Sequence, residues 1–453
     1  MKKLFGTDGM RGEAGKFPLD ATTVETVGRS LAEHLRGQLG RPPLIVVGRD
    51  TRESGAWIER EVSKGVASAG AELRSAGVIT TPGVAYLARA LSADAGIVIS
   101  ASHNPYQDNG LKLFAPLGKK LDEQTERLIE KDIFSSQSQG PEKAPNSTRY
   151  DVDSSEREQL QQRYLNFLTD EVGAGLSLKG LSIVVDCANG AATTLAPALL
   201  ARLGAGISAI NNSPDGRNIN LNCGSLHMEQ LQREVVERGA DLGVAFDGDA
   251  DRALFVDDRG DVVNGDGTLW LLANYLHTRQ RLKADTVIAT VMSNIGLELA
   301  LQSRGIKLIR TDVGDKYVLD ELLRTGASLG GEQSGHIILP KLSLAGDGMI
   351  TTLSVLRAMT EEKQSVRQLA HGLKTFPQVL VNVKVKRKLP FEQFNSLVER
   401  RQQIEKLLGS SGRLLLRYSG TEPLARVMLE GESQSQIESF AHELAAEIRR
   451  VLG

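Results

Sequence analysis

Short apolar runs alternate with amphipathic stretches up to about residue 370 of the chain. Four apolar runs of strand length each end in a polar turn: residues 44–47, 95–99, 181–186 and 286–292. Helical patterns follow three of them, over residues 53–70, from Ala191 and from Ile295. Alternating strands and helices predict largely parallel sheets with right-handed crossovers. The recurrence predicts one βα-rich unit used three times, although the copies share too little identity to prove duplication.

Polar segments divide this pattern. Residues 135–158 contain almost no large apolar side chain, so we expect a linker there. Residues 257–260 predict a hairpin turn, and a further break lies at residues 372–377. We therefore expect α/β domains over residues 1–150, 151–256 and 257–372.

The pattern changes after the last break. A strand over residues 378–385, a helix over 391–408, short strands around Arg417 and Val427, and a helix over 434–452 are expected. Residues 373–453 are therefore predicted to form a smaller α+β domain, different in kind from the other three.

Composition sets limits on function. At 453 residues the chain is too long for one hydrophobic core, since single cores stop growing at about 250–300 residues. The formal net charge of −2 argues against a nucleic-acid-binding protein, and two cysteines cannot form a disulfide framework. No secretory signal and no apolar run of about 20 residues is present, so we expect a cytoplasmic protein with no membrane partner. The sequence leaves open whether it is a monomer or a homodimer.

Ser102 follows a strand pattern and lies in a polar loop. The apolar run at 95–99 stops abruptly, and an extended apolar pattern that contains Lys112 resumes after a turn at 108–110. Loops at strand ends expose reactive groups while the sheet fixes their position, so Ser102 suits a nucleophile or a phosphoryl carrier. A serine that only caps a helix or completes a turn is the alternative, and this loop alone does not decide.

Three carboxylates, Asp247, Asp249 and Asp251, stand at alternating positions after another apolar run. They can converge on one hard divalent cation such as Mg²⁺, which typically also takes a phosphate oxygen. An EF-hand loop has the same initial spacing, but Arg252 and Asp258 stand where it needs Gly and Glu. A solvated acidic turn is the weaker alternative, because clustered carboxylates repel one another and a metal would relieve that repulsion.

A loop at residues 330–336 offers groups that suit sugar hydroxyls. Glu332, Ser334 and His336 would alternate to one side if this segment is extended, which would present donors and acceptors together. Such residues are more often structural, so the signal is weak by itself.

The last polar loop suits a phosphate. The strand around Arg417 leads into Ser419, Gly420 and Thr421, whose amides and hydroxyls can form an anion nest, and Arg426 follows. The two arginines could clamp a phosphate, whereas a hairpin turn with surface arginines is the alternative.

Together, the motifs predict phosphoryl transfer to or from a phosphosugar. They occur in the order and at the approximate spacing of the α-D-phosphohexomutase superfamily, which the chain resembles over essentially its whole length. The residues that carry the resemblance are 100–105, 247–252, 331–336 and 417–423. Within the superfamily, residues 5–12, residues 104–110 and Gln333 resemble the bacterial branch that acts on glucosamine phosphates.

The resemblance implies mixed sheets, four domains around a central cleft and a phosphoserine mechanism. Ser102 would be phosphorylated in the resting enzyme, and its phosphate would complete the Mg²⁺ shell begun by the three aspartates. Glucosamine 6-phosphate would become glucosamine 1,6-bisphosphate, turn end for end and return its other phosphate to Ser102. This bisphosphate or glucose 1,6-bisphosphate is the expected activator, and we expect the fourth domain to swing during the turn.

The resemblance also implies a role for each candidate residue. Lys112 is the preferred general acid or base, with His103 as the second candidate, and Arg11 and Arg252 would neutralise charge around the phosphoserine. Sugar hydroxyls would bind Glu332, Ser334 and His336. The non-reacting phosphate would bind Arg417, Ser419, Gly420, Thr421 and Arg426.

Two other functions stay open. A phosphoglucomutase or phosphomannomutase would use the same motifs on a neutral hexose. A phosphosugar-binding sensor would need the arginines and the acidic loop but would have no use for Ser102.

Overall fold

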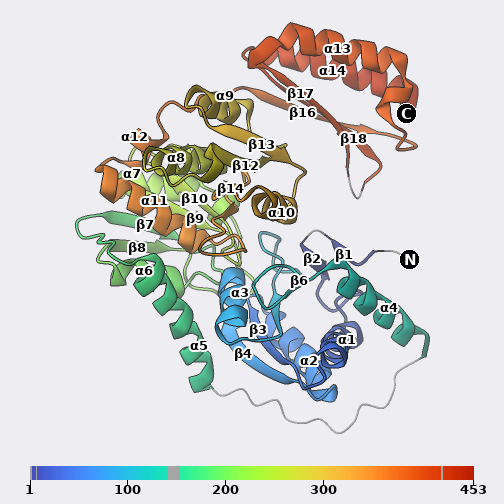
Figure 1. The fold of residues 1–453 in the computed structure, drawn as a ribbon, viewed down its shortest axis with the longest axis vertical. Helices are drawn as coiled ribbons and strands as arrows, with labels where there is room; N and C mark the ends of the chain where they lie inside the picture. Colours follow the sequence, from blue (N-terminus) through green and yellow to red (C-terminus); the bar gives the residue numbers. More distant parts are fainter. Residues whose placement is uncertain (1–2, 7, 140–153, 420–421) are drawn as a thin grey trace.

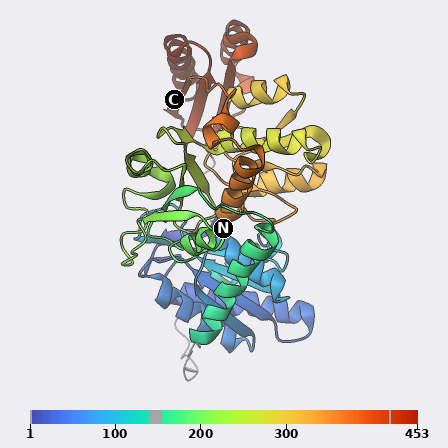
Figure 2. The same ribbon diagram turned by 90° about the vertical axis from the view of Figure 1, so that its left-hand side faces the viewer.

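In the computed structural model, residues 3–6, 8–139, 154–419 and 422–453 are described. The chain forms four successive domains, and the first and fourth lie at opposite ends of the longest axis (Figure 1). The view in Figure 2 shows the same order, with the second and third domains between them. None of the described helices is long and apolar enough to cross a membrane.

The first domain is built on a six-stranded mixed sheet. Its elements are β1 (Phe5–Gly6), β2 (Gly9–Glu13), α1 (Ala21–Leu39), β3 (Leu44–Arg49), α2 (Gly55–Ser68), β4 (Glu72–Val78), α3 (Thr81–Ala90), β5 (Ala95–Ile99), β6 (Asp108–Phe114) and α4 (Glu123–Gln139). The strand order is β1-β2-β6-β5-β3-β4. Strands β4, β3 and β5 run parallel, and β6, β2 and β1 add on antiparallel.

A five-stranded sheet forms the second domain. Its elements are α5 (Ser154–Asn166), a π-helical turn (Phe167–Val172), β7 (Ser182–Asp186), α6 (Leu195–Arg202), β8 (Gly206–Ile210), a 3₁₀ turn (Gly224–Leu226), α7 (Glu229–Arg238), β9 (Leu242–Phe246), β10 (Ala253–Val256) and β11 (Val262–Val263). The strand order is β11-β10-β9-β7-β8, with β10 and β11 antiparallel to their neighbours.

The third domain has a four-stranded sheet in the order β13-β12-β14-β15. Its elements are α8 (Gly265–Thr278), a 3₁₀ turn (Lys283–Asp285), β12 (Thr286–Thr290), α9 (Ile295–Ser303), β13 (Lys307–Thr311), α10 (Asp315–Thr325), β14 (Gly330–Gly331), β15 (Ile337–Ile338), α11 (Gly348–Glu362) and α12 (Val366–Ala370).

An antiparallel three-stranded sheet and two long helices make up the fourth domain, as the sequence predicts. Its elements are β16 (Gln378–Lys384), a 3₁₀ turn (Phe391–Gln393), α13 (Asn395–Leu408), a second 3₁₀ turn (Gly409–Ser411), β17 (Arg413–Tyr418), β18 (Leu424–Glu430) and α14 (Gln434–Leu452). The strand order is β16-β18-β17.

One four-strand unit recurs in the first three sheets, which confirms the prediction of similar topology. In each sheet a central strand, β3, β7 or β12, has a parallel neighbour on both sides. An antiparallel strand, β6, β10 or β15, then pairs with the later of these two neighbours. The turns β5–β6, β9–β10 and β14–β15 carry Ser102, Asp249 and Ser334. Equivalent turns of a repeated unit therefore carry three of the predicted motifs.

The first three domains share a hydrophobic core, whereas the fourth has its own. One cluster of buried side chains includes Val46, Val185 and Val287 from three sheets. The fourth domain packs α13 and α14 on its sheet around a separate cluster. Polar contacts join it to the third domain: Arg413 Nη2 donates to the Ser293 carbonyl at 3.0 Å.

Two expectations about element limits are wrong. The linker expected over residues 135–158 is partly helical, because α4 continues to Gln139 and α5 begins at Ser154; residues 140–153 lie outside the described part. The polar start of α5 is held by Arg157, whose guanidinium pairs with Glu59 at 3.2 Å, so tertiary contact supports a helix that lacks an apolar face there. The helix expected from Ala191 begins at Leu195, after a turn.

Candidate active site

Ser102 lies buried in the β5–β6 turn, with its backbone in the left-handed region (φ 53°). This conformation is uncommon for residues other than glycine. It persists only where the surrounding structure holds it, which often occurs at functional sites. Ser102 Oγ donates to Asp247 Oδ2 at 2.6 Å, and its backbone N–H donates to Ser100 Oγ at 2.9 Å. The structure therefore brings the predicted carrier of the first domain against the predicted metal site of the second.

A fully buried arginine that sequence reasoning missed holds the Ser102 loop. Arg52 donates to the carbonyl oxygens of Ser102, Asn104 and Asp108 at 2.9, 2.8 and 3.0 Å. Its Nε pairs with Asp50 Oδ2 at 2.9 Å, and both side chains are completely buried. Leaving one partner of such a pair alone typically costs about 3–5 kcal/mol. The signal in the sequence was a charged turn directly after the first apolar run, but nothing there links that turn with Ser102.

Asp247, Asp249 and Asp251 lie together in the β9–β10 turn, all buried, and can present oxygens within 4.8 Å of one another. Burial and the carboxylates of Asp251 and Asp249 raise the pKa of Asp247 well above its usual range. Asp249 Oδ1 and Asp251 Oδ1 are buried without a hydrogen-bond partner. Hard carboxylate oxygens that repel one another and lack a hydrogen-bond donor fit a divalent cation such as Mg²⁺. The flanking β9 and β10 are strands, which excludes an EF-hand.

Lys112 lies on β6 and is buried among carboxylates. Its Nζ is 2.7 Å from Asp249 Oδ2, 3.3 Å from Asp251 Oδ2 and 3.2 Å from Asp8 Oδ2. Burial alone would lower the pKa of Lys112, but these three carboxylates raise it well above its usual range. Lys112 is therefore a charged group held next to the acidic turn.

His103 lies between the serine and an arginine. His103 Nδ1 is 3.3 Å from Ser102 Oγ and 3.3 Å from Arg252 Nη1. Burial, followed by the positive charges of Arg252 and Arg11, lowers the pKa of His103 to about 4. The imidazole is therefore neutral at pH 7 and able to accept a proton.

Arg11 lies on β2 at the edge of the same loop. It pairs with Asp8 and approaches Asn104 Oδ1 at 3.5 Å. The structure thus gathers Arg11, Arg252, His103 and Lys112 around Ser102 and the acidic turn.

The loop at residues 330–336 is not extended, so the condition for alternating side chains is not met. It forms a tight β14–β15 hairpin, in which the N–H of Glu332 donates to the His336 carbonyl at 2.9 Å and Gly335 takes a positive φ of 92°. Its glycines make the turn possible, since only glycine adopts such a conformation at low cost. His336 consequently points to Asp251 at 3.6 Å, while Glu332 Oε1 accepts from the N–H of Gly314 at 3.1 Å and the Ser334 hydroxyl lies 3.4 Å from Glu332 Oε2. The three side chains do not alternate along a strand.

The arginines of the fourth domain face each other across β17 and β18. Arg417 and Arg426 are directly opposite in the ladder, and Arg417 Nη2 lies 3.8 Å from Met292 Sδ. Burial and the neighbouring Arg426 lower the pKa of Arg417. Like charges placed opposite each other are unfavourable unless an anion joins them. Ser419 is buried next to them, and Gly420 and Thr421 lie outside the described residues.

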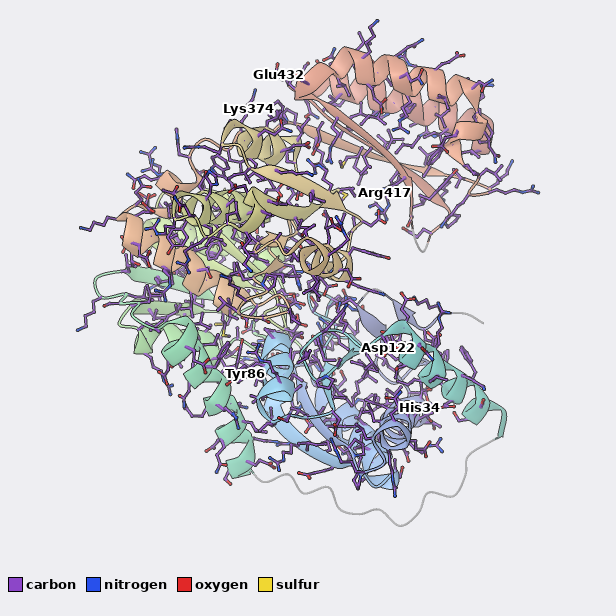
Figure 3. All side chains as sticks on the ribbon, in the orientation of Figure 1. His34, Tyr86, Asp122, Lys374, Arg417 and Glu432 are labelled. Atoms are coloured by element: carbon purple, nitrogen blue, oxygen red, sulfur yellow. The ribbon has the colours of Figure 1, made fainter. Side chains whose placement is uncertain are left out.

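A cleft of about 420 Å³ lies beside the acidic turn. The residues that line it include Arg11 and His103 of the first domain, Arg252 of the second, and Glu332 and His336 of the third. Among the described residues, none from the fourth domain lines it. Arg417 lies on the fourth domain, apart from the first (Figure 3). The structure therefore joins three of the motifs and leaves the two arginines separate.

Comparisons with known proteins agree with this architecture. Four models of the phosphoglucomutase/phosphomannomutase family match in order: alpha/beta/alpha domain I at residues 2–140, domain II at 162–260, domain III at 264–376 and the C-terminal domain at 380–447. A phosphoglucosamine mutase of Solibacter usitatus is 48% identical and covers 100% of this chain and 99% of its own.

Solved structures share the fold. A phosphoglucomutase/phosphomannomutase family protein of Burkholderia thailandensis superposes with a TM-score of 0.80 at 24% identity, covering 100% of this chain and 98% of its own. The N-acetylphosphoglucosamine mutase of Aspergillus fumigatus, solved in complex with GlcNAc-6P and magnesium, has a TM-score of 0.64 at 18% identity and covers 99% of this chain and 96% of its own. On the strength of the full-length identity and the four matched domains, the chain belongs to the phosphoglucosamine mutase family of the phosphohexomutase superfamily.

Proposed function

We propose that this protein interconverts glucosamine 6-phosphate and glucosamine 1-phosphate, with Ser102 as the phosphoryl carrier and a 1,6-bisphosphate as intermediate. The observation that carries the proposal is the contact of Ser102 Oγ with Asp247 of the buried acidic turn at 2.6 Å, beside a cleft whose lining includes Arg11 and Arg252. A sensor would have no use for such a serine. The product would supply the synthesis of UDP-N-acetylglucosamine and cell-wall precursors.

Asp247, Asp249 and Asp251 would hold Mg²⁺ together with the phosphate on Ser102. Bound there, the ion would neutralise charge on the transferred phosphoryl group. The two unpartnered carboxylate oxygens support this assignment, as does the magnesium in the related Aspergillus fumigatus structure.

The chain's own residues would move the proton. As the O1 hydroxyl of the sugar attacks phosphorus, the bond between phosphorus and Ser102 Oγ breaks and the hydroxyl proton needs an acceptor. Over the whole step that proton ends on Ser102 Oγ. Lys112 is the preferred residue to pass it on, and His103, whose Nδ1 lies 3.3 Å from Ser102 Oγ, is the second candidate. Arg11 and Arg252 would offset the charge of the phosphoserine.

The third and fourth domains would hold the substrate. Glu332 and His336 line the cleft, and these two side chains together with Ser334 would bind sugar hydroxyls. Arg417, Ser419, Gly420, Thr421 and Arg426 would bind the phosphate that is not reacting, for which the fourth domain has to approach the cleft. Glucosamine 1,6-bisphosphate or glucose 1,6-bisphosphate would act as activator by loading Ser102.

A cytoplasmic site of action completes the proposal. Cys187 and Cys223 are both free thiols in buried positions, as in proteins kept in reducing compartments. The prediction from the sequence that the protein is a monomer or a homodimer stays a prediction.

The decisive assay compares turnover of glucosamine 6-phosphate with that of glucose 1-phosphate and mannose 1-phosphate, with bisphosphate activator present. We expect glucosamine 6-phosphate to have the highest kcat/KM. A preference for a neutral hexose by orders of magnitude would instead indicate a phosphoglucomutase or phosphomannomutase, and no turnover of any of them would indicate a sensor.

A further inference from the structure

Six side chains of alternating charge form a closed ring beside the cleft. In order around the ring they are Lys112, Asp8, Lys120, Asp315, His336 and Asp251. The charged atoms of successive members are 3.2, 2.8, 2.8, 3.8, 3.6 and 3.3 Å apart, the last distance closing the ring from Asp251 to Lys112. Each carboxylate of the ring therefore lies between two nitrogen-bearing side chains.

The ring joins loops of three domains. Asp8, Lys112 and Lys120 belong to the first domain, Asp251 follows β9 in the second, and Asp315 begins α10 in the third. His336 precedes β15 in the third domain. Because the members come from separate sheets, the ring fixes these loops relative to one another.

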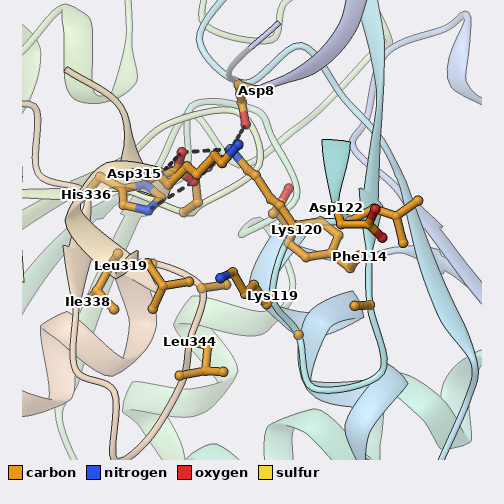
Figure 4. Close-up of a pocket in the computed structure, with 18 of the residues that line it drawn as sticks. Asp8, Phe114, Lys119, Lys120, Asp122, Asp315, Leu319, His336, Ile338 and Leu344 are labelled. Carbon is orange, nitrogen blue, oxygen red and sulfur yellow. Dashed lines mark hydrogen bonds and ion pairs between the residues drawn. The ribbon is translucent and has the colours of Figure 1, made fainter. Parts of the chain in front are cut away.

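The surroundings strengthen the ring. On one side it borders the cleft, and on the other a second cavity of about 350 Å³ shares Asp8, Asp251, Asp315 and His336. Apolar side chains such as Phe114, Leu319 and Leu344 line that cavity (Figure 4). Ion pairs next to apolar groups are less screened than those in water.

Lys120 is a member of the ring that connects the first domain directly with the third. Its Nζ lies 2.8 Å from Asp8 Oδ1 and 2.8 Å from Asp315 Oδ2, and Figure 4 shows it between the two carboxylates. Asp8 in turn contacts Lys112, and Asp315 approaches His336 at 3.8 Å. Lys120 thus contacts Asp8, the partner of Lys112, and Asp315, the partner of His336.

We propose that Lys120 is a positioning residue for phosphoryl transfer, which acts through Asp8 and Asp315 to hold Lys112 and His336 against Asp251 of the acidic turn. Without its charge, Asp8 and Asp315 would face each other across the domain boundary with no cation between them and would repel. Misplacing reacting groups by about 1 Å can cost on the order of 100-fold in rate. The inference rests on the proposed mutase function.

A neighbouring lysine offers a matched control. Lys119 comes from the same loop and pairs across the same domain boundary with Asp320 at 2.8 Å, but both partners are more than 40% exposed and outside the ring. If these ion pairs only held the two domains together, replacing Lys119 and replacing Lys120 would affect activity equally. If the ring positions Lys112 and His336, only the replacement of Lys120 should lower activity.

The experiment compares K120M, K120R and K119M with the wild-type enzyme, under saturating bisphosphate activator. We expect K120M to lower kcat for glucosamine 6-phosphate on the order of 100-fold with less than about threefold change in KM, because positioning acts on the reacting state. K120R should recover to within about tenfold of the wild type, since it restores the charge. K119M should match the wild type, and all variants should keep the phosphate content of Ser102.

A double variant keeps the inference falsifiable if K120M is less stable. In the proposed arrangement K120M/D315N loses no more activity than K120M, because Lys120 and Asp315 act as one unit. Independent, multiplicative losses would overturn the inference, as would a K120M enzyme with wild-type kcat or a K119M enzyme equally impaired. Failure of the proposed function is separate from all of these, since it would appear as absent turnover in the wild type.

Discussion

The two halves of the site are built in opposite ways. Ser102, the acidic turn and the surrounding cations come from three domains that share one core, and their charges are already paired with one another. The arginine pair Arg417 and Arg426 belongs to a domain with a separate core, and its two like charges face each other. In the proposed function the reaction centre would therefore be assembled before substrate arrives, whereas the proposed phosphate-binding half would need an anion and the approach of its domain. This difference fits an enzyme whose intermediate must reorient between a fixed unit, the first three domains, and a movable fourth domain.

The largest effect should come from the fixed half. Replacing Ser102 with Ala removes the carrier, so we expect loss of the covalent phosphate and a fall in kcat of at least about a thousandfold. Intact-mass measurement and turnover of glucosamine 6-phosphate check this. Undiminished turnover by S102A would show that the serine carries nothing.

Arg52 tests whether the Ser102 loop is held by its buried arginine. Arg52→Met leaves Asp50 buried without its partner and releases the carbonyls of the loop. We expect the free energy of unfolding to fall by about 3–5 kcal/mol, measured by chemical denaturation. R401M, on an exposed helix pair with Glu405, is the control and should cost less than about 1 kcal/mol. Equal losses in the two variants would contradict the account.

Arg417 tests the movable half. In R417K the bidentate fork is lost, so we expect KM for glucosamine 6-phosphate to rise by about tenfold to about 100-fold. The transfer step at Ser102 should be unaffected, so the single-turnover rate of phosphoryl transfer at saturating substrate should change little. A variant that loses the transfer step but binds substrate normally would place Arg417 in the reaction centre and remove the contrast between the two halves.

The smallest effect is expected at Glu126. Unlike the paired charges of the site, this partly buried carboxyl lies near other carboxylates. Burial raises the pKa of Glu126 to about 7, with Glu123 and Glu130 adding to the shift and Lys3 and Lys316 opposing it. The folded protein holds this proton more tightly than the unfolded chain does, so ionisation lowers stability as pH rises from about 4.5 to about 7. Glu126→Gln should therefore leave the unfolding midpoint unchanged at pH 4 and raise stability by about 1 kcal/mol at pH 8, a value reduced for partial exposure. Thermal unfolding at both pH values measures this, and a stabilisation at pH 4 alone would be the wrong sign.

Sequence reasoning reached the parts of the site that are contiguous in the chain. Ser102 and Asp247 follow apolar runs closely in the sequence, and the combination of the motifs indicates their chemistry. Arg52, Asp8 and Lys120 were missed as functional, because their importance comes from contacts made only when separate sheets pack together.

The expectations that failed had physical reasons of the same kind. The alternation of Glu332, Ser334 and His336 depended on an extended segment, whereas the glycines of this loop allow a turn that brings His336 onto Asp251. Part of the expected linker is helical because Arg157 finds a buried partner in another domain. The domain limits, and the binding of phosphate by Gly420 and Thr421, stay predictions.

The most direct test follows the phosphate itself. Enzyme carrying radiolabelled phosphate on Ser102 is mixed with excess glucosamine 6-phosphate and stopped at successive times within one turnover. The account predicts that label leaves Ser102 and appears in glucosamine 1,6-bisphosphate at least as fast as glucosamine 1-phosphate forms. Label that stays on Ser102 while product accumulates would contradict it.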